Sequence, residues 1–480
     1  MGDWVTGGLG GWEGLMGMGF RLVEPRFLPP LDGGFRPAVL SNHAFRDEVG
    51  VSGVGVPLVL GLERSDGSVS RFETQVFAEG HPRAEANLVY AERLLKFLLW
   101  QCGGWKVYVG GPRSIAAYIR RCYAPDGVRA FDHHFMAEKV YQKPFTVVHC
   151  APEEVPPEQE RERALGRHLD GCRIGFDLGA SDLKISAVVD GEAIYSDEIV
   201  WEPSGQSDSQ YHYDIIVAAI RTAAAKMARV DAIGGSSAGV YVDNRPMVAS
   251  LFRGIPAERF EQVRTMFLRM RDEMGVPLEV VNDGEVTALA GSMSLGDNGV
   301  LGIALGSSEA GGYVTMSGSI TGWLNELAFA PVDYSPDAPV DEWSGDRGCG
   351  ASYLSQQCVF RLAPKAGISI PEGVPNAEKL KFVQRKLEAG HEGAIKIWQS
   401  VGVYMGYAIA HYADFYDLKH VLILGRCTSG KGGSIIREGA NVVLRAEFPA
   451  LAARINVQLP DEESRRVGQS IAAASLPTIR

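Results

Sequence analysis

The part of the chain after residue 171 repeats one order of elements, and this repeat constrains the fold more than any other feature of the sequence. Residues 172–191, CRIGFDLGASDLKISAVVDG, predict a β-hairpin with an apolar first strand, and residues 299–320 predict a second hairpin with glycines at its turn. Each hairpin is followed by helical patterns and by apolar strands that end in polar or glycine-rich corners. We therefore predict an α/β fold that combines parallel and antiparallel strands in one sheet and is built twice.

A proline-rich, highly charged segment divides the chain of 480 residues. It starts at Ala151, contains Pro152, Pro156 and Pro157, and continues into a dense run of charges. Such a composition is typical of a linker. We predict an N-terminal α/β domain over residues 1–150, a linker over 151–171, and a two-lobed domain over 172–480, in keeping with usual domain sizes.

The N-terminal region has mixed α/β character. Two strand patterns meet at Asp66-Gly67, which is a hairpin turn signal, and helical and strand patterns follow up to residue 123. A few residues could suggest a metal site, but their spacing matches no ligand pattern, and packed or surface histidines are the favoured interpretation. These residues are His133, His134, His149 and Cys150. The sequence does not predict the role of this region.

Composition narrows the class of protein. The formal net charge is -11, which argues against nucleic acid as a partner because phosphate binding needs clustered Lys and Arg. The seven cysteines are scattered without a CxxC pair, as expected in a reducing cytosol. Residues 1–20 lack the positive start of a signal peptide and do not predict a spanning helix. We expect a cytoplasmic protein that does not bind membranes.

The turn of the first hairpin, GFDLGASDLK, carries a candidate phosphate site. Gly179 allows a close backbone approach, and the amides of Gly179, Ala180 and Ser181 can point at phosphate oxygens. Asp177 could hold Mg²⁺ through water. An ordinary turn with an acidic neighbour explains the same residues, and taken alone it is the favoured interpretation.

A second candidate site lies in EVVNDGEVTALAG, where an apolar strand ends at Asn282-Asp283 and a helix begins. One interpretation makes Asp283 a helix cap, because carboxylates are stabilised at helix N-termini. The other makes it a general base that takes the proton of an attacking hydroxyl. The residues alone do not decide between the two.

Two further glycine-rich turns are candidates for nucleotide contacts. Gly306 and Ser307 belong to the turn of the second hairpin, which could form another phosphate loop or be a plain hairpin. Gly425 follows a buried strand and could floor a nucleotide base. Lys431 is not a Walker lysine, because the spacing of the glycines is wrong and Gly432 follows it.

The order of these motifs resembles the sugar kinase, Hsp70 and actin superfamily, and residues from about 173 onward resemble the ROK family of repressors and sugar kinases. GFDLGASDLK is similar to that family's GIDIGGTKI, VVNDGEVTALAG to its NDANAAALGE, and GWLNELAFAPVD to its AGEIGHxxV segment. SSAGVYVDNRPMVAS is similar to its PGxVD turn, and SGDRGCGASYLS to the end of its CxCGxxGCLExxxS knuckle. The resemblance implies a two-lobed actin-like fold.

The resemblance also implies an activity, namely ATP-dependent phosphorylation of a hydroxyl on a hexose or amino sugar. Asp283 would be the base, and the sugar would be bound by Asn282, Glu326, Gly239 and Asp243. ATP and Mg²⁺ would be held at Asp177, Gly179, Ala180, Ser181, Gly306, Ser307 and Gly425. A homodimer is expected by analogy. The alternatives are a non-catalytic, sugar-sensing regulator and a partner-binding scaffold.

The sequence departs from the family pattern at the zinc knuckle. The family's metal ligands correspond here to Glu342, Ser344, Cys349 and, in place of a histidine, Phe329. A tetrahedral zinc site needs four ligands, so we expect no zinc, with Cys349 packed as a small apolar side chain. In the turn itself, Asp346 and Arg347 could pair with each other.

The second hairpin departs from the pattern as well, because it carries Glu309 where the family has glycine-rich sequence. A carboxylate that pointed inward would repel ATP, and one that pointed outward would be harmless.

Overall fold

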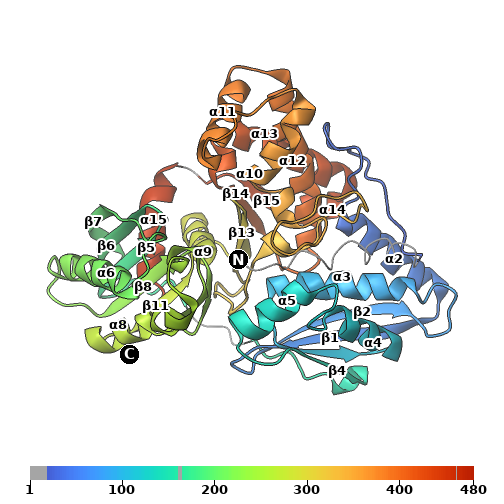
Figure 1. Cartoon of the computed structure of the whole chain (residues 1–480), viewed down its shortest axis with the longest axis horizontal. Coiled ribbons are helices and arrows are strands. Elements are labelled where there is room, and N and C mark those ends of the chain that lie inside the picture. The colour runs from blue at the N-terminus through green and yellow to red at the C-terminus, as the bar shows by residue number, and fades with distance from the viewer. Residues whose placement is uncertain (1–18, 161–164, 461, 480) are drawn as a thin grey trace.

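The computed structural model describes residues 19–160, 165–460 and 462–479. They form an N-terminal domain and two lobes, which meet at the centre of the molecule (Figure 1). Each of the three parts is built on its own β-sheet. The predicted α/β class and the additional N-terminal domain are both confirmed.

The N-terminal domain has a four-stranded sheet in the order β2-β1-β3-β4. Strands β1 and β2 pair antiparallel from Gly55↔Phe77 to Glu63↔Val69, which confirms the predicted hairpin at Asp66-Gly67. The elements are α2 (Ala38–Ser52), β1 (Gly55–Glu63), β2 (Val69–Phe77), α3 (Ala86–Gln101), β3 (Lys106–Gly110), α4 (Arg113–Cys122), α5 (Ala130–His134), a π-helical turn (Phe135–Val140) and β4 (Thr146–Cys150).

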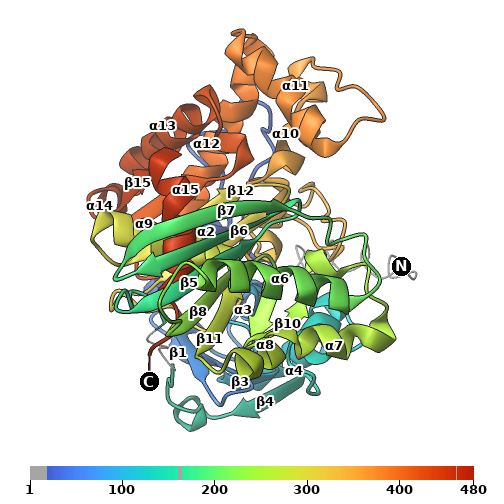
Figure 2. The same ribbon diagram turned by 90° about the vertical axis from the view of Figure 1, so that its left-hand side faces the viewer.

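The first lobe has a five-stranded sheet in the order β11-β8-β5-β6-β7, in which β5, β8 and β11 run parallel and β6 and β7 are antiparallel additions. In Figure 2, helices α6 and α8 lie in front of this sheet. The elements are β5 (Cys172–Leu178), β6 (Asp182–Val189), β7 (Glu192–Val200), α6 (Ser209–Ala224), β8 (Ala232–Ser237), β9 (Val240–Val242), β10 (Arg245–Val248), α7 (Phe260–Arg264), α8 (Met266–Met274), β11 (Leu278–Asn282) and α9 (Asp283–Leu295).

The second lobe repeats the plan with a four-stranded sheet in the order β13-β12-β14-β15. Strands β12 and β13 form the predicted hairpin, and β14 and β15 add to it in parallel. The elements are β12 (Val300–Leu305), β13 (Glu309–Val314), α10 (Gln356–Leu362), α11 (Asn376–Glu388), α12 (Glu392–Tyr412), β14 (His420–Leu424), α13 (Lys431–Glu447), α14 (Pro449–Ala452) and β15 (Asn456–Gln458). They are followed in the chain by α15 (Glu462–Ala474).

Helix α15 belongs to the first lobe although it comes last in the chain. It packs on β5, β8 and α9, and its backbone touches the sheet at two glycines. A Cβ on Gly234 would lie 1.6 Å from the carbonyl oxygen of Ala473, and one on Gly175 would lie 1.9 Å from that of Ser470. The sheet and α15 therefore approach each other more closely than any side chain would allow.

The N-terminal domain contacts both lobes. Residues before α2 run along the second lobe, where the amides of Phe27 and Leu31 donate to Tyr407 and Ser400 on α12. Helix α3 packs against the turn at Leu327–Phe329, and the π-helical turn contacts β10 of the first lobe. The boundary predicted at residue 150 separates regions of sequence that pack against each other extensively.

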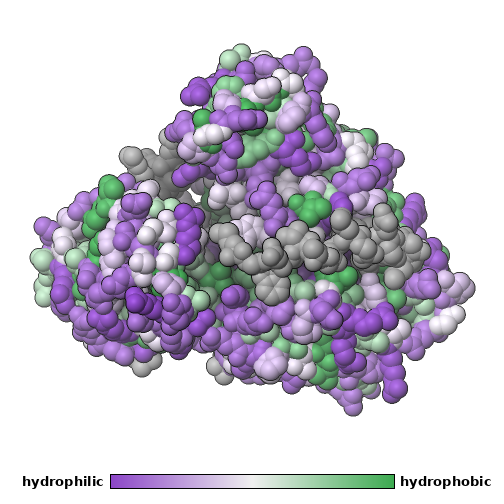
Figure 3. All heavy atoms as spheres, in the orientation of Figure 1, coloured by the Kyte–Doolittle hydropathy of each residue, from purple (hydrophilic) through white to green (hydrophobic). Residues whose placement is uncertain are grey.

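Polar side chains predominate on the face shown in Figure 3, and the surface there is hollowed between the first and second lobes. Among the described residues, no helix is both long enough and apolar enough to cross a membrane.

The contact of α15 with the sheet gives a prediction for stability. Gly234→Ala would force a methyl group into the Ala473 carbonyl, and overpacking of this kind costs roughly 1–3 kcal/mol of unfolding free energy or more. Gly50→Ala is the matched control, because Gly50 lies within α2 with no atom within 4 Å of its Cβ position. We expect it to be neutral or to stabilise by about 0.5–1 kcal/mol. Urea denaturation of both variants checks this, and equal stabilities would contradict it.

Candidate functional site

The turn between β5 and β6 holds the first group of predicted site residues. The amide of Gly179 donates to the Asp182 carbonyl over 2.8 Å, and the carbonyl of Gly179 accepts from the Trp201 indole over 2.9 Å. These bonds close the turn tightly, while Ala180 and Ser181 stay exposed. The amides of Ala180 and Ser181 therefore lie at the rim of the first lobe, where a ligand can reach them.

Asp177, at the end of β5, faces the same region. Its carboxylate is half-buried and accepts a hydrogen bond of 2.7 Å from the Ser236 hydroxyl on β8. Burial raises the pKa of Asp177, and the bond from Ser236 opposes that rise. The side chain thus has a fixed orientation and a lone pair left for a ligand.

Asp283 is the first residue of α9, directly after β11. Asn282 caps this helix, because its side-chain oxygen accepts from the Gly284 amide over 2.7 Å and its NH₂ donates to the Gly239 carbonyl over 2.7 Å. The capping interpretation thus fits Asn282 best, although Asp283 also accepts from Gly284 over 3.0 Å. The bond from Gly284 uses one carboxylate oxygen of Asp283, and the other oxygen is left for a ligand.

Three carboxyl groups from distant parts of the sequence come together where the lobes meet. Burial, and then the charge of Asp177, raise the pKa of Asp283 to about 6. Burial, and then the charge of Asp283, raise the pKa of Glu326 to about 7. Because the charge of Asp177 acts on Asp283 and that of Asp283 acts on Glu326, the three side chains form one electrostatic cluster. The sequence predicts each of these residues separately but not their association.

Glycines set the position of Asp283 between the lobes. A Cβ on Gly312 of β13 would lie 1.9 Å from the Gly284 carbonyl, and a Cβ on Gly284 would lie 2.3 Å from the Gly311 carbonyl. The start of α9 therefore rests directly on the backbone of the second-lobe hairpin. This contact brings the end of β11 next to β13.

The structure also brings together the two glycine-rich turns of the second lobe. Gly425 has φ +97°, and a Cβ there would lie 2.6 Å from the backbone of Leu305, the residue before Gly306. Gly306 closes its own turn by donating to the Ser308 carbonyl over 3.0 Å, while Ser307 is exposed at the tip. The turns around Gly306 and Gly425 thus form one edge.

Asp243 lies apart from the carboxyl cluster. With Asn244 it forms the tight turn between β9 and β10, where both residues have positive φ. It lines a cavity of about 60 Å³ together with Arg64, Asp66 and Ser68 of the N-terminal hairpin and Val280. The described lining of that cavity does not include Asp283 or Glu326.

Phe329, which stands where the resemblance places a histidine, belongs to an aromatic cluster. Its ring centroid lies 4.3 Å from that of Trp100 and 5.4 Å from that of Phe131. Phe135 completes the cluster, 4.9 Å from Trp100. Three of these four rings come from the N-terminal domain, so this domain adjoins the segment that carries Glu326. No pattern in the sequence predicted that contact.

The knuckle loop (residues 340–350) is held by hydrogen bonds. One carboxylate oxygen of Asp341 accepts from the amides of Trp343 and Ser344 and from the Ser344 hydroxyl, at 3.2, 2.7 and 2.7 Å. Gly345 and Gly348 have φ near +70°, as the turn requires. Cys349 is fully buried, and burial raises the pKa of its thiol, which confirms its prediction as a packed side chain.

No group of three or more His, Cys, Asp or Glu side chains able to hold a metal ion occurs among the residues that the structure describes. The histidines considered in the N-terminal region have ordinary partners. His133 bonds to the Tyr123 carbonyl, His134 to Glu138, and His149 to the Gly111 carbonyl.

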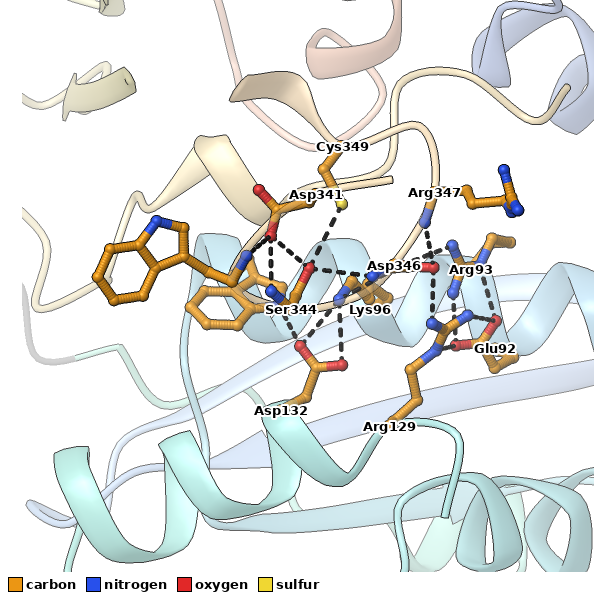
Figure 4. Close-up of polar contacts among 12 residues, drawn as sticks. Glu92, Arg93, Lys96, Arg129, Asp132, Asp341, Ser344, Asp346, Arg347 and Cys349 are labelled. Atoms are coloured by element: carbon orange, nitrogen blue, oxygen red, sulfur yellow. Dashed lines mark hydrogen bonds and ion pairs between the residues drawn. The ribbon is translucent and has the colours of Figure 1, made fainter. Parts of the chain in front are cut away.

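Asp346 of the knuckle loop enters a buried group of charges in the N-terminal domain, shown in Figure 4. We call this group the ion cluster; its three carboxylates and three cations are all at most 4% exposed. The members are Glu92, Asp132, Asp346, Arg93, Lys96 and Arg129. The formal charges of the six side chains sum to zero, and Asp346 is the only member that does not belong to the N-terminal domain.

The ion pairs of Asp346 are short. Its carboxylate lies 2.7 Å from Arg129, 3.1 Å from Arg93 and 3.3 Å from Lys96. Although burial lowers the pKa of Lys96, the charges of Asp132 and Asp346 outweigh it and raise that pKa. The cation therefore stays charged inside the protein.

The pairing of Asp346 with Arg347 suggested by the sequence is wrong. The backbone amide of Arg347 donates a hydrogen bond of 2.8 Å to the Asp346 carboxylate. The guanidinium of Arg347 points away from Asp346 and donates to the Ala338 carbonyl. The Asp346 carboxylate pairs instead with Arg93 and Lys96 of α3 and with Arg129. The one available sign in the sequence was the presence of Glu92, Arg93 and Lys96 within an otherwise apolar helix, AERLLKFLLW.

Glu309 points into the core of the second lobe. It is 2% exposed and accepts a hydrogen bond of 2.8 Å from the Tyr412 hydroxyl on α12. Burial raises its pKa to about 8, against the effect of the Tyr412 bond. The side chain is thus protonated and uncharged at neutral pH, so it does not set a negative charge in the hairpin turn.

No protein-family model matches the sequence, and neither does any curated protein. A ROK family transcriptional regulator, a homologue of the E. coli MLC protein, superposes with a TM-score of 0.53 and 18% identity, over 64% of this chain and 78% of that one. A ROK hexokinase from Thermus thermophilus superposes with a TM-score of 0.50 and 17% identity, over 63% of this chain and 97% of that one. The chain has the ROK fold.

This fold accounts for the two lobes. More than a third of the chain is not matched in either structure. At sequence identities below a fifth, this structural similarity shows the fold alone. The activity has to be argued from the site.

The position of Glu309 gives a prediction for the pH dependence of stability. Its pKa is about 8 in the folded state and near 4.5 in the unfolded chain, so the folded state holds the proton more tightly. The stability that this provides is complete below pH 4.5 and is lost as the pH rises through 8, by about 3 kcal/mol between pH 5 and 8. Glu309→Gln, which keeps the Tyr412 bond, removes this contribution. Denaturant unfolding should show the variant gaining on the wild type as pH rises; a constant difference would contradict it.

Proposed function

We propose that the protein is an ATP-dependent sugar kinase, which transfers the γ-phosphoryl group of ATP to a hydroxyl of a hexose or amino sugar. The observation that carries this proposal is the placement of Asp283. It lies at the start of α9 between the lobes, in one cluster with Asp177 and Glu326, and its pKa is raised to about 6. A carboxylate with a pKa near the working pH is suited to general base catalysis.

In this proposal each part of the site has a role. Asp283 takes the proton of the acceptor hydroxyl as that oxygen attacks the γ-phosphorus of ATP. Glu326 accepts hydrogen bonds from other hydroxyls of the sugar, and Asn282 fixes the start of α9 and the adjacent Gly239 carbonyl. Because phosphoryl transfer leaves little covalent work for a protein, positioning and charge neutralisation supply most of the rate.

The nucleotide fits the two glycine-rich edges. The exposed amides of Ala180 and Ser181, with Gly179, would bind phosphate oxygens from one side, and those of Gly306 and Ser307 from the other. Gly425, without a side chain, packs directly on the backbone of Leu305 and so keeps its turn beside that of Gly306. A bound Mg²⁺ would neutralise phosphate charge, and Asp177, held by Ser236, fits as its ligand through water.

Asp243 has a lesser place in the proposed site. Its exposed turn lines the small cavity next to the N-terminal hairpin rather than the carboxyl cluster. We propose it as a contact for an outer part of the substrate. The proposed setting is the cytoplasm, with a homodimer as the assembly and no nucleic acid or membrane as partner.

A non-catalytic, sugar-sensing protein is the second candidate. The observation that favours it is Phe329, whose ring packs on Trp100 and offers no hydrogen bond to a sugar. Such a protein would bind a sugar between the lobes without turning over ATP. The N-terminal domain, with its four-stranded sheet, differs from the winged helix-turn-helix of ROK repressors.

Replacement of the base tests the proposed activity. Asp283→Asn keeps the size of the side chain but cannot accept the proton, so we expect turnover to fall by about 10²- to 10⁴-fold. The measurement is ADP release with a panel of hexoses and N-acetylated hexosamines. Asp47→Asn, at an exposed position of α2 outside the proposed site, is the control and should keep most of the activity. Sugar-induced thermal stabilisation of the wild type without turnover would favour the sensor.

The pKa of Asp283 predicts a pH profile. The base acts when deprotonated, so kcat/KM should rise with pH through an apparent pKa of about 6 and reach a plateau above pH 7. Steady-state kinetics between pH 5 and 8 at saturating Mg²⁺ and ATP provide the measurement. A rate that is flat over this range would exclude Asp283 as the base.

A further inference from the structure

Helix α3 of the N-terminal domain is bonded directly to the segment that carries Glu326. The amides of Asn325 and Glu326 donate to the carbonyls of Gln101 and Trp100, the last residues of α3, both over 2.9 Å. Asn325 has φ +49°, a conformation that residues with a side chain adopt at a cost. The end of α3 therefore holds the backbone in the shape that presents Glu326.

The same helix is fastened to the second lobe by the ion cluster. Arg93 and Lys96, one to two turns before Trp100, pair with Asp346 of the knuckle loop. Trp100 joins the two attachments, because its indole donates to the cluster member Asp132 over 2.6 Å while its carbonyl accepts from Glu326. The ring of Trp100 also packs against that of Phe329, three residues after Glu326.

The charge balance explains why Asp346 is needed. Without it the N-terminal domain would bury three cations, Arg93, Lys96 and Arg129, against two carboxylates. A buried charge without a partner is strongly unfavourable. The second lobe supplies the missing negative charge from the loop that otherwise resembles a zinc knuckle.

We propose that the ion cluster positions the acceptor site: Asp346 fixes α3 on the second lobe, and α3 in turn fixes Glu326. Asp346, Lys96 and Trp100 are thus positioning residues that act through the backbone of Asn325 and Glu326. In this arrangement the knuckle loop is held by ion pairs with the N-terminal domain. A bound metal would instead link residues within the loop to one another. The part concerning acceptor affinity rests on the proposed kinase function.

The test must separate positioning from stability. Asp346→Asn alone leaves an unbalanced cation and should lower the melting temperature markedly. The double variant Asp346→Asn/Arg129→Met leaves two carboxylates and two cations, still paired as Glu92–Arg93 and Asp132–Lys96, and should recover much of that loss. It still lacks the tie between the knuckle loop and α3. Asp341→Asn is the matched control, since this buried carboxylate of the same loop bonds to Trp343 and Ser344 and not to α3.

Two readouts are compared across these full-length variants. The first, which needs no ligand, is hydrogen exchange of the amides of Asn325 and Glu326, measured by mass spectrometry. The second is the KM for the sugar that the wild type phosphorylates best, set against the KM for ATP. For the double variant we expect faster exchange at both amides and an acceptor KM raised about 10-fold or more, with the KM for ATP little changed. The Asp341→Asn control should show neither effect.

The outcomes distinguish the two proposals. Unchanged exchange in the double variant overturns the positioning role, whatever the activity. Faster exchange with an unchanged acceptor KM overturns it as well, because Glu326 would then not depend on α3 for its function. A wild type without turnover contradicts the kinase function and leaves hydrogen exchange to decide whether the ion cluster positions Glu326.

Discussion

The burial of the Asp346 carboxylate among three cations is the interaction on which the rest of the structure depends. Its neighbours Arg93, Lys96 and Arg129 lie in another domain and are buried as deeply. Charges removed from water are tolerated only when every one is paired in good geometry. The interface between the N-terminal domain and the second lobe therefore cannot loosen gradually. It is either fully formed or strongly unfavourable, so the two parts behave as one body.

This arrangement changes what the knuckle loop does. Its glycine turn and its buried Cys349 are those of a compact loop, and Asp341 supplies the internal hydrogen bonds that hold it. A structural metal stabilises a loop without reference to the rest of the protein. An ion cluster shared with a second domain makes the shape of the loop depend on that domain. The aromatic packing of Phe329 on Trp100 extends the same dependence toward Glu326.

Local patterns in the sequence predicted the elements well, because hairpin turns and strand periodicity are short-range. They also predicted Asp177 and Asp283 as strand-end residues, whose meeting follows from strands that end at one edge of a sheet. The partners of buried charges could not be predicted in this way. Asp346 is 253 positions from Arg93, and only the packing of two domains brings them together. The orientation of Glu309 depends in the same way on Tyr412, 103 positions away.

The path of residues before α2 has a consequence for biosynthesis. Phe27 and Leu31 bond to Tyr407 and Ser400, which are 380 and 369 positions later in the chain. During synthesis, Phe27 and Leu31 therefore cannot reach these partners until α12 has been made. Until then α3 carries Glu92, Arg93 and Lys96 without the carboxylate that balances them, beside a largely apolar surface. Contacts of such long range slow folding and prolong exposure of that surface. A nascent chain that stops before Asp346 and α12 therefore leaves this part of the N-terminal domain without its partners.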